Sequence, residues 1–250
     1  FKPTKRTWGA EVFPGSSLPN AMVQVSPVTK FHSGAGYQYE DSVIYGFTHT
    51  NKGHWNLCHI PLLPVTGTPT PGDYCSPFSH ERESAAPGYY QVFLDRYGVD
   101  AQLSSTLRCA FHKYTYPAGA AASLLADLQR SNEHVRAWDI RKEGDNVFAG
   151  WQQTGEKMYF YAVANRPVTG IEPVVEGDRE VRIVRFGEGD GALELRIGFS
   201  FVSEKNAREN LEAEMLGKSF AEVRSEATAT WNDLLGRIRV EGGTEREKGL

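Results

Sequence analysis

Apolar and polar side chains alternate with a period of two residues along much of this chain. Residues 192–200 show the pattern most clearly, because Leu193, Leu195 and Ile197 alternate with polar neighbours. Such alternation predicts half-buried antiparallel strands. Similar runs occupy residues 21–26, 89–95, 99–103, 157–163 and 181–186. Glycine, proline and acidic turn residues separate these runs, and no strand–helix–strand order occurs, so the pattern favours a β-sandwich or β-barrel.

The period changes to that of a helix after Ser203. Three apolar residues spaced four apart share one helical face: Ala207, Leu211 and Met215. Ser219 and Glu222 have the spacing of a capping box and predict the start of a second helix. The second helix carries an apolar stripe made by Phe220, Val223, Ala227, Trp231, Leu234 and Ile238. We expect these helices either to fold back on the strands or to bridge to a further domain.

Composition narrows the class of protein. The chain has 250 residues, 40% of them hydrophobic, and a net charge of -4 from well-mixed acidic and basic residues. This length fits one large all-β domain or two average ones. No basic stripe points to nucleic acid, and no apolar run reaches the length of a membrane helix. With an odd number of cysteines, buried thiols are favoured over a disulfide framework, although one bridge is compatible with the count.

The segment 13–77 alternates little and is rich in glycine, proline, histidine, asparagine and aromatic residues. Long irregular segments on a β scaffold are usually binding surfaces. Residues 36–42 (GYQYEDS) combine carboxylates with aromatic rings, and residues 46–59 (GFTHTNKGHWNLCH) combine imidazoles, amides, a thiol and an indole. An indole covers the C–H face of a pyranose, while amides, imidazoles and carboxylates bond to its hydroxyls. The composition of both stretches therefore suits a sugar site.

Other interpretations of these residues stay open. Trp55 is also compatible with a core position, and Asp41 with a turn cap or a surface ion pair. A zinc site from the three histidines of residues 46–59 and Cys58 has no common ligand spacing. Glu40 and Asp41 are adjacent, so on an extended chain they point to opposite faces and do not suit a shared acid–base role.

The sequence resembles glycoside hydrolase family 92. Residues 14–27 (PGSSLPNAMVQVSP) resemble the opening PGA…PFGMVQLSP of that family, and residues 36–50 (GYQYEDSVIYGFTHT) resemble its G-Y-x-Y-x-D-x-x-I-x-G-F-S-H-T block. Further blocks follow in the family's order at residues 86–99, 106–117, 197–207 and 231–243. The resemblance thus extends over almost the whole chain.

The resemblance implies a mainly β fold, a twisted antiparallel β-sandwich (supersandwich) followed by two linker helices. It implies a sandwich over 1–202, a helical linker over 203–239, and the start of a missing (α/α)6 catalytic domain over 240–250. Members of the family are calcium-dependent, inverting exo-α-mannosidases that release terminal mannose from glycans, and are mostly secreted or periplasmic. We therefore expect mannose-containing glycans and the catalytic domain of the same polypeptide as partners. We expect neither a nucleic-acid partner nor a membrane span, and we expect an α-1,2 linkage preference.

In this family the catalytic acid, the catalytic base and the calcium ligands lie on the barrel, so the resemblance assigns none of them to this chain. It implies that the sandwich contributes loops that contact sugar. The substrate-binding residues predicted on this basis are Ser16, Ser17, Asp41, His49, Asn51, His54, Trp55, Asn56 and Cys58. Many members continue H-L-S-G-x-G from the histidine at 49, whereas this chain has TNKGHWNLCH after it. We expect Trp55 in this divergent loop to face the leaving-group sugar. A stand-alone, non-catalytic carbohydrate-binding sandwich is the alternative.

Overall fold

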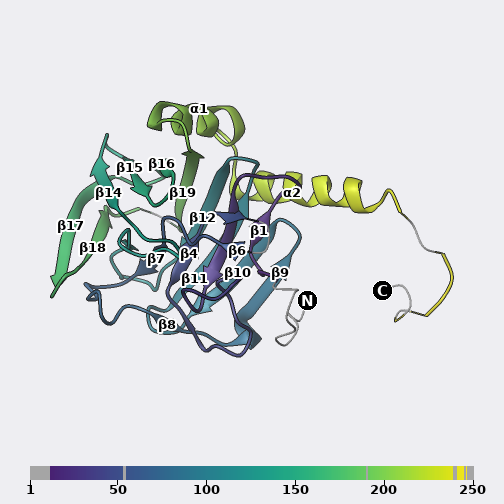
Figure 1. The fold of residues 1–250 in the computed structure, drawn as a ribbon, viewed down its shortest axis with the longest axis horizontal. Coiled ribbons are helices and arrows are strands. Elements are labelled where there is room, and N and C mark those ends of the chain that lie inside the picture. The colour runs from purple at the N-terminus through teal and green to yellow at the C-terminus, as the bar shows by residue number, and fades with distance from the viewer. Residues whose placement is uncertain (1–11, 53–54, 190, 239–240, 245, 247–250) are drawn as a thin grey trace.

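Two large antiparallel sheets form the body of the molecule in a computed structural model, which describes residues 12–52, 55–189, 191–238, 241–244 and 246. Figure 1 shows the two layers and the helices α1 (Glu204–Glu214) and α2 (Phe220–Leu235) on one side of them. This arrangement confirms a mainly β sandwich followed by two helices. None of the described helices is both long and apolar enough to span a membrane.

The first sheet has seven strands in the order β1-β2-β4-β7-β13-β18-β17. All of its neighbouring strands are antiparallel. Their bounds are β1 Ser16–Ser17, β2 Gln24–Val28, β4 Gly46–Thr48, β7 Leu62–Val65, β13 Ser123–Ala126, β18 Arg179–Phe186 and β17 Val168–Glu176. Most of the predicted sugar-binding residues lie in or near the short strands at one edge of this sheet.

The second sheet has eight strands in the order β14-β15-β16-β19-β12-β11-β10-β9. Their bounds are β14 Ala137–Lys142, β15 Val147–Gln153, β16 Lys157–Ala164, β19 Leu193–Ser200, β12 Cys109–Thr115, β11 Val99–Ser105, β10 Tyr89–Leu94 and β9 Glu83–Ala86. The last strand in the chain, β19, pairs with β12 on one side and with β16 on the other. It therefore joins two groups of strands that are each built from consecutive hairpins.

Smaller elements lie in the connections. The pairs β3 (Val43–Ile44) with β8 (Ser76–Pro77), and β5 (Asn51–Lys52) with β6 (Trp55–Asn56), form two-stranded sheets. A 3-10 turn, η1, covers His80–Arg82. The described residues of segment 13–77, which alternates little in sequence, thus form only short strands.

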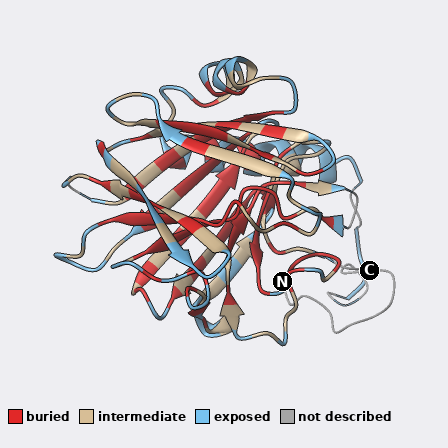
Figure 2. Ribbon diagram, turned by 60° about the vertical axis from the view of Figure 1, so that its left-hand side comes forward, coloured by how far each residue is buried: buried red, intermediate tan, exposed pale blue. Residues whose placement is uncertain are grey.

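The main core lies between the two large sheets. In β16 every second residue is buried, and in β19 Leu193, Leu195 and Ile197 are completely buried, as the alternation predicts. Figure 2 shows the buried residues gathered along the inner strands and the exposed residues along the rim. Burial of one large apolar side chain contributes roughly 1.5–3 kcal/mol, so the aromatic and aliphatic residues here supply the main drive for folding.

A second apolar cluster holds the helices against the outer face of the eight-stranded sheet. Cys109 and Phe111 of β12 pack there with Leu211 of α1 and with Phe220 and Val223 of α2. Helix α1 lies directly on β19, since a side chain at Gly198 would overlap the backbone of the helix. Both helices therefore fold back on the sandwich.

The start of α2 confirms the predicted capping box. The Ser219 backbone N–H donates to Glu222 Oε2 at 2.8 Å, and the Glu222 N–H donates back to Ser219 Oγ at 3.3 Å. Only the first half of the predicted apolar stripe is buried. Trp231 is half-buried, while Ile238, beyond the end of the helix, is 81% exposed.

Candidate functional site

The short hairpin β5–β6 presents the most exposed aromatic ring of the predicted sugar-binding set. Its register pairs Asn51 with Asn56 and Lys52 with Trp55. Trp55 is 40% exposed, so it is not a core side chain. An indole placed in this way offers an apolar face to a ligand while the rest of the ring packs on the protein.

Loops on both sides hold the hairpin in place. The Asn56 N–H donates to the Gly34 carbonyl at 2.8 Å, and the Asn56 carbonyl accepts from Asn132 Nδ2 at 2.6 Å. Gly36 has a φ of 73°, and a Cβ at this position would lie 2.8 Å from Asn56 Nδ2. Glycine is therefore required beside the hairpin both for the backbone conformation and for space.

The side chains of Asn56 and Cys58 face inward. Asn56 Oδ1 accepts from the Cys58 N–H at 2.7 Å, and Asn56 Nδ2 donates to Thr48 Oγ1 at 3.2 Å. The Cys58 thiol packs with Val28 and Phe31, and burial raises its pKa. A buried thiol of raised pKa is a poor nucleophile, so Cys58 serves the architecture of the loop in this chain. Its φ of 54° is unusual for a residue other than glycine.

His49 lies beneath the hairpin in a sealed pair with His112. Their Nε2 atoms are 3.1 Å apart, and His112 Nδ1 is 2.5 Å from the Tyr114 hydroxyl. The His49 ring also lies against Phe199, with ring centres 4.6 Å apart. Burial lowers the pKa of His49 to about 3 and that of His112 in the same direction. Both rings are therefore neutral at physiological pH.

His59 is also buried, but a short chain of polar groups connects it to the surface. Its Nδ1 is 2.9 Å from Thr50 Oγ1, and its Nε2 is 3.0 Å from Thr154 Oγ1. The Thr154 hydroxyl donates to Glu133 Oε2 at 2.6 Å, and the Glu133 side chain is 41% exposed. Burial lowers the pKa of His59, while Glu133 acts in the opposite direction. These contacts connect the buried His59 ring to the surface beside the hairpin through polar groups.

The amide of Asn51 has unmet hydrogen-bonding capacity. Both its Oδ1 and its Nδ2 are buried and have no partner among the described residues. An unsatisfied buried polar group costs about 1–3 kcal/mol, so such a group tends to mark a place where another molecule or segment bonds. Asn51 and Trp55 lie on opposite strands of the same hairpin. They are the two predicted residues whose state in this chain is best suited to a ligand.

The remaining predicted residues lie further from Trp55. Ser16 Oγ is 2.8 Å from Ser105 Oγ, and the Ser17 carbonyl accepts from Trp231 Nε1 at 2.7 Å. Ser17 is paired with Gln24, whose N–H donates to the His49 carbonyl at 3.1 Å, so β1 lies one strand away from His49.

Asp41 has no described contact with the hairpin, and its Oδ2 is buried without a partner. His54 lies outside the described residues. The structure thus brings Asn51, Trp55 and Asn56 together, places His49, Cys58, Ser16 and Ser17 beneath or beside them, and leaves Asp41 apart.

Three residues that lie beside the hairpin are not among the nine predicted from the sequence. Asn132 bonds to it, and Glu133 and Thr154 connect to His59. Each lies about 75–95 residues further along the chain than its partner. Only the Ser131–Asn132–Glu133 cluster of polar residues before β14 hinted at a functional loop.

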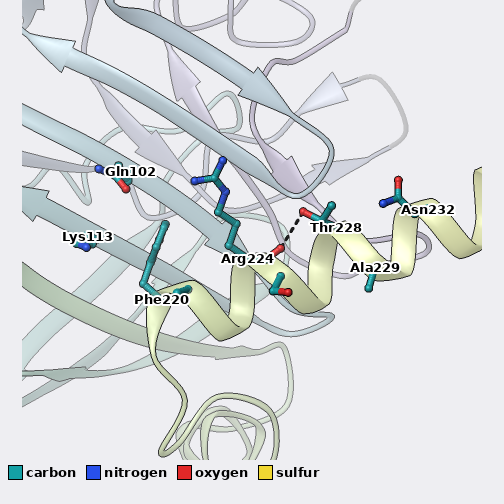
Figure 3. Close-up of a pocket in the computed structure, with 9 residues that line it drawn as sticks. Gln102, Lys113, Phe220, Arg224, Thr228, Ala229 and Asn232 are labelled. Atoms are coloured by element: carbon teal, nitrogen blue, oxygen red, sulfur yellow. Dashed lines mark hydrogen bonds between the residues drawn. The ribbon is translucent and has the colours of Figure 1, made fainter.

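A hollow of about 600 Å³ lies elsewhere, between α2 and strands β11 and β12 (Figure 3). Gln102 and Lys113 line it from the strands, and Phe220, Arg224 and Asn232 line it from the helix. None of the predicted sugar-binding residues lies there. The Arg224 guanidinium covers the Tyr89 ring at 3.6 Å, which identifies its role as packing of the helix.

The described residues bear on the expected calcium chemistry. They contain no group of three or more histidine, cysteine, aspartate or glutamate side chains placed to hold a metal. Calcium prefers six to eight oxygen ligands, and carboxylates are usually among them. The described part of this chain therefore does not fit a calcium site built from such side chains.

Comparison with protein families first identifies the class of protein, a domain of a glycoside hydrolase. Residues 4–211 match the glycosyl hydrolase family 92 N-terminal domain, and residues 206–250 match the glycosyl hydrolase family 92 catalytic domain. The chain belongs to glycoside hydrolase family 92, as its sequence blocks suggest.

Solved structures agree with this assignment. The chain is 25% identical to a family GH92 α-mannosidase from Bacteroides thetaiotaomicron, with a TM-score of 0.85 over 93% of this chain and 37% of that one. A family GH92 inverting mannosidase from the same organism shares the fold, with 23% identity and a TM-score of 0.81 over 94% and 34% of the two chains.

A curated relative is similar as well. An uncharacterized secreted glycosidase of Arthroderma benhamiae is 24% identical over 94% of this chain and 37% of its own length. The chain thus spans a little over a third of the length of the first relatives that it matches.

Proposed function

We propose that this chain is the N-terminal, pocket-completing domain of a calcium-dependent, inverting exo-α-mannosidase that releases terminal α-1,2-linked mannose from glycans. The match to the family 92 N-terminal domain over residues 4–211 carries the proposal. A relative that shares the fold is described as an α-mannosidase. The part played by this chain is to bind and orient sugar rather than to break the bond.

In this proposal the hairpin contacts the sugar next to the scissile bond. The exposed Trp55 ring covers the apolar face of the leaving-group sugar. The Asn51 side-chain amide, which has no partner among the described residues, bonds to a hydroxyl. The buried His49, Asn56 and Cys58 act as positioning residues, because their contacts fix the loop that carries Trp55. Ser16, Ser17, Asp41 and His54 are further proposed sugar contacts.

The bond-breaking groups belong to the catalytic domain of the same polypeptide. An inverting glycosidase needs an acid and a base about 6.5–9.5 Å apart, so that a water molecule fits between the base and the sugar. We assign neither group to this chain. Calcium, when bound by the catalytic domain, would hold and polarise sugar hydroxyls.

Export from the cytoplasm forms part of the same proposal. The curated relative is described as secreted, which supports a periplasmic or extracellular location for this protein. Terminal mannose on glycans is also met mainly outside the cytoplasm. Fractionation of the native host, with detection of the protein in the medium or periplasm, tests this point.

A second candidate is a stand-alone carbohydrate-binding sandwich. One observation favours it, because the exposed indole and the Asn51 amide, for which the described residues supply no partner, both belong to this chain and need no second domain. This candidate predicts that the 250-residue chain by itself binds mannobiose, whereas the mannosidase proposal predicts turnover only by the full-length protein.

Hydrolysis of α-1,2-mannobiose by the full-length protein, with and without a calcium chelator, tests the main proposal. We expect calcium-dependent release of mannose in the β-anomeric form from the full-length protein and none from the 250-residue chain. Trp55→Ala should lower kcat/KM on the order of tenfold, whereas Trp55→Phe, which keeps an aromatic face, should retain most of it. Absence of release from every α-mannoside would reject the mannosidase and leave the binding module.

A further inference from the structure

A pocket of about 540 Å³ near the end of the β17–β18 hairpin has an unusual lining. Arg130, Arg136 and Arg179 line it together with Gln129 and the indole of Trp138. Among the described residues, no aspartate or glutamate lines it. Three guanidinium groups beside one aromatic ring form a surface suited to a ligand that carries a negative charge.

Two of these arginines are held in place from below. Arg179 Nη2 donates to Asp127 Oδ2 at 2.6 Å, and Asp127 is completely buried. The Tyr74 hydroxyl donates to the same carboxylate oxygen at 2.6 Å and accepts from Arg130 Nη1 at 3.2 Å. The Arg130 guanidinium also covers the Phe31 ring at 4.2 Å. The network fixes both side chains before any ligand binds, which reduces the entropy lost on binding.

The guanidinium of the third arginine has no partner in the part of the chain that the structure describes. The Arg136 backbone N–H bonds to the Gln153 carbonyl at 2.8 Å, but its guanidinium makes no hydrogen bond or ion pair with the described residues. Arg182 lies over Trp138 at 5.3 Å and is paired with Glu180. Of the four guanidinium groups near Trp138, those of Arg179 and Arg182 are paired with carboxylates, so the pocket keeps a surplus of positive charge.

We propose that this pocket binds a phosphate or sulfate ester carried by a saccharide. The arginines bond to the ester oxygens, because a guanidinium presents planar donors that match an oxyanion. The Trp138 ring borders the pocket and offers the sugar an apolar wall. The oxyanion part rests on the arginines alone, and the saccharide part rests also on the membership in a glycosidase family. The pocket lining and the Trp55 hairpin share no residue, and the loop that carries Arg130 and Arg136 also bonds to the hairpin through Asn132.

Titration calorimetry of this chain with mannose 6-phosphate, mannose 6-sulfate, neutral mannose and inorganic phosphate tests the proposal. We expect at least one ester to bind about tenfold more tightly than either mannose or inorganic phosphate, and its binding to weaken as sodium chloride is raised from low to high concentration. The tighter of the two esters identifies the ligand. Equal binding of ester and neutral mannose overturns the oxyanion part, and equal binding of ester and inorganic phosphate overturns the saccharide part.

Variants locate the site. Arg136→Gln should weaken ester binding about tenfold without loss of folding, because the side chain is exposed and has no described partner. Arg208→Gln, on the exposed face of α1, removes an equal charge outside the pocket and should leave binding unchanged. Equal losses from both variants would mean that the ester responds only to net charge. The indole N–H signal of Trp138, assigned with Trp138→Phe, should shift on ester binding, and an unmoved signal would also reject this site.

Anion binding is measured without turnover on this chain. Its failure therefore leaves the mannosidase proposal standing, and failure of mannobiose hydrolysis leaves the arginine pocket standing.

Discussion

His49 and His59 lie ten residues apart in the same loop region, and both are buried, yet their surroundings differ. His49 is closed in with His112 and Phe199, whereas His59 connects through Thr154 to the exposed carboxylate of Glu133. Both belong to one stretch whose composition suits a sugar site, although only His49 was predicted to contact the sugar. The difference teaches that imidazole content alone does not separate a histidine that stabilises the core from one that communicates with the surface.

The largest expected effect is the loss of stability in acid that the buried His49–His112 pair causes. The pKa of His49 falls from its ordinary value of 6.5 to about 3 on folding, so the unfolded chain binds more protons between these two values. The free energy of unfolding is therefore not reduced by His49 protonation above pH 6.5, and it falls as the pH drops below this value. We expect a loss of about 3 kcal/mol between pH 6.5 and pH 4 from His49 alone, with His112 adding in the same direction.

Urea unfolding at several pH values measures this slope. The double variant His49→Gln/His112→Gln should flatten it over the same window. A slope that is equally steep in the double variant would place the acid sensitivity elsewhere in the molecule.

Removal of one partner from the sealed pair should have the next largest effect. His112→Leu leaves His49 Nε2 and the Tyr114 hydroxyl without their partner inside the core. We expect the free energy of unfolding to fall by about 2–3 kcal/mol at neutral pH, because buried polar groups then lack hydrogen bonds. Chemical denaturation at pH 7.5 measures the change. A loss below about 0.5 kcal/mol would show that the pair adds little to the core.

Loss of the Thr154 hydroxyl, which connects His59 to Glu133, should lower the free energy of unfolding by a smaller amount. Thr154→Val keeps the shape of the side chain and removes the hydroxyl that bonds to both His59 Nε2 and Glu133 Oε2, while the direct 3.4 Å approach of these two atoms remains. We expect a loss of about 1 kcal/mol, since water near the exposed Glu133 can replace part of the lost bonding. Thr169→Val on strand β17, at an exposed position outside this network, is a control for the change of residue type alone. Equal effects of the two threonine changes would argue against a special role for Thr154.

The smallest effect on stability should come from the surface end of that path. Glu133→Gln should change the free energy of unfolding by less than about 0.5 kcal/mol, because the carboxylate is half exposed. It should nevertheless lower the pKa of His59 further, since Glu133 now acts to raise it. NMR titration of the His59 ring protons measures this shift. An unchanged pKa would mean that His59 is as isolated as His49.

Local patterns in the sequence predicted the regular parts of the fold. The alternation of β16 and β19 and the capping box at Ser219 depend on neighbours in sequence, and the structure confirms all three. Leu107 shows the limit of such patterns. It continues the apolar alternation of β12, but it is 47% exposed because the strand starts only at Cys109.

The surroundings of the candidate site could not be predicted in the same way. The contacts of Asn132, Glu133 and Thr154 with the hairpin region join residues that are far apart in the chain. The arginine pocket likewise combines the loop before β14 with the start of β18. Contacts of this kind depend on how the sheets are stacked, and no local periodicity records them. The sugar-binding roles of the nine predicted residues stay predictions.

The position of β19 has a consequence for biosynthesis. β19 lies between β12 and β16, so the facing edges of these two strands stay unpaired until β19 is synthesised. Roughly 80 residues of synthesis separate the end of β12 from the start of β19, about 4–16 s at ordinary elongation rates. The β12 edge is a template for unwanted pairing with another nascent chain throughout that time, and the β16 edge only after β16 ends at Ala164. The yield of soluble protein should therefore depend on how quickly the ribosome synthesises residues 193–200. It should also depend on how well chaperones shield the two unpaired strand edges until then.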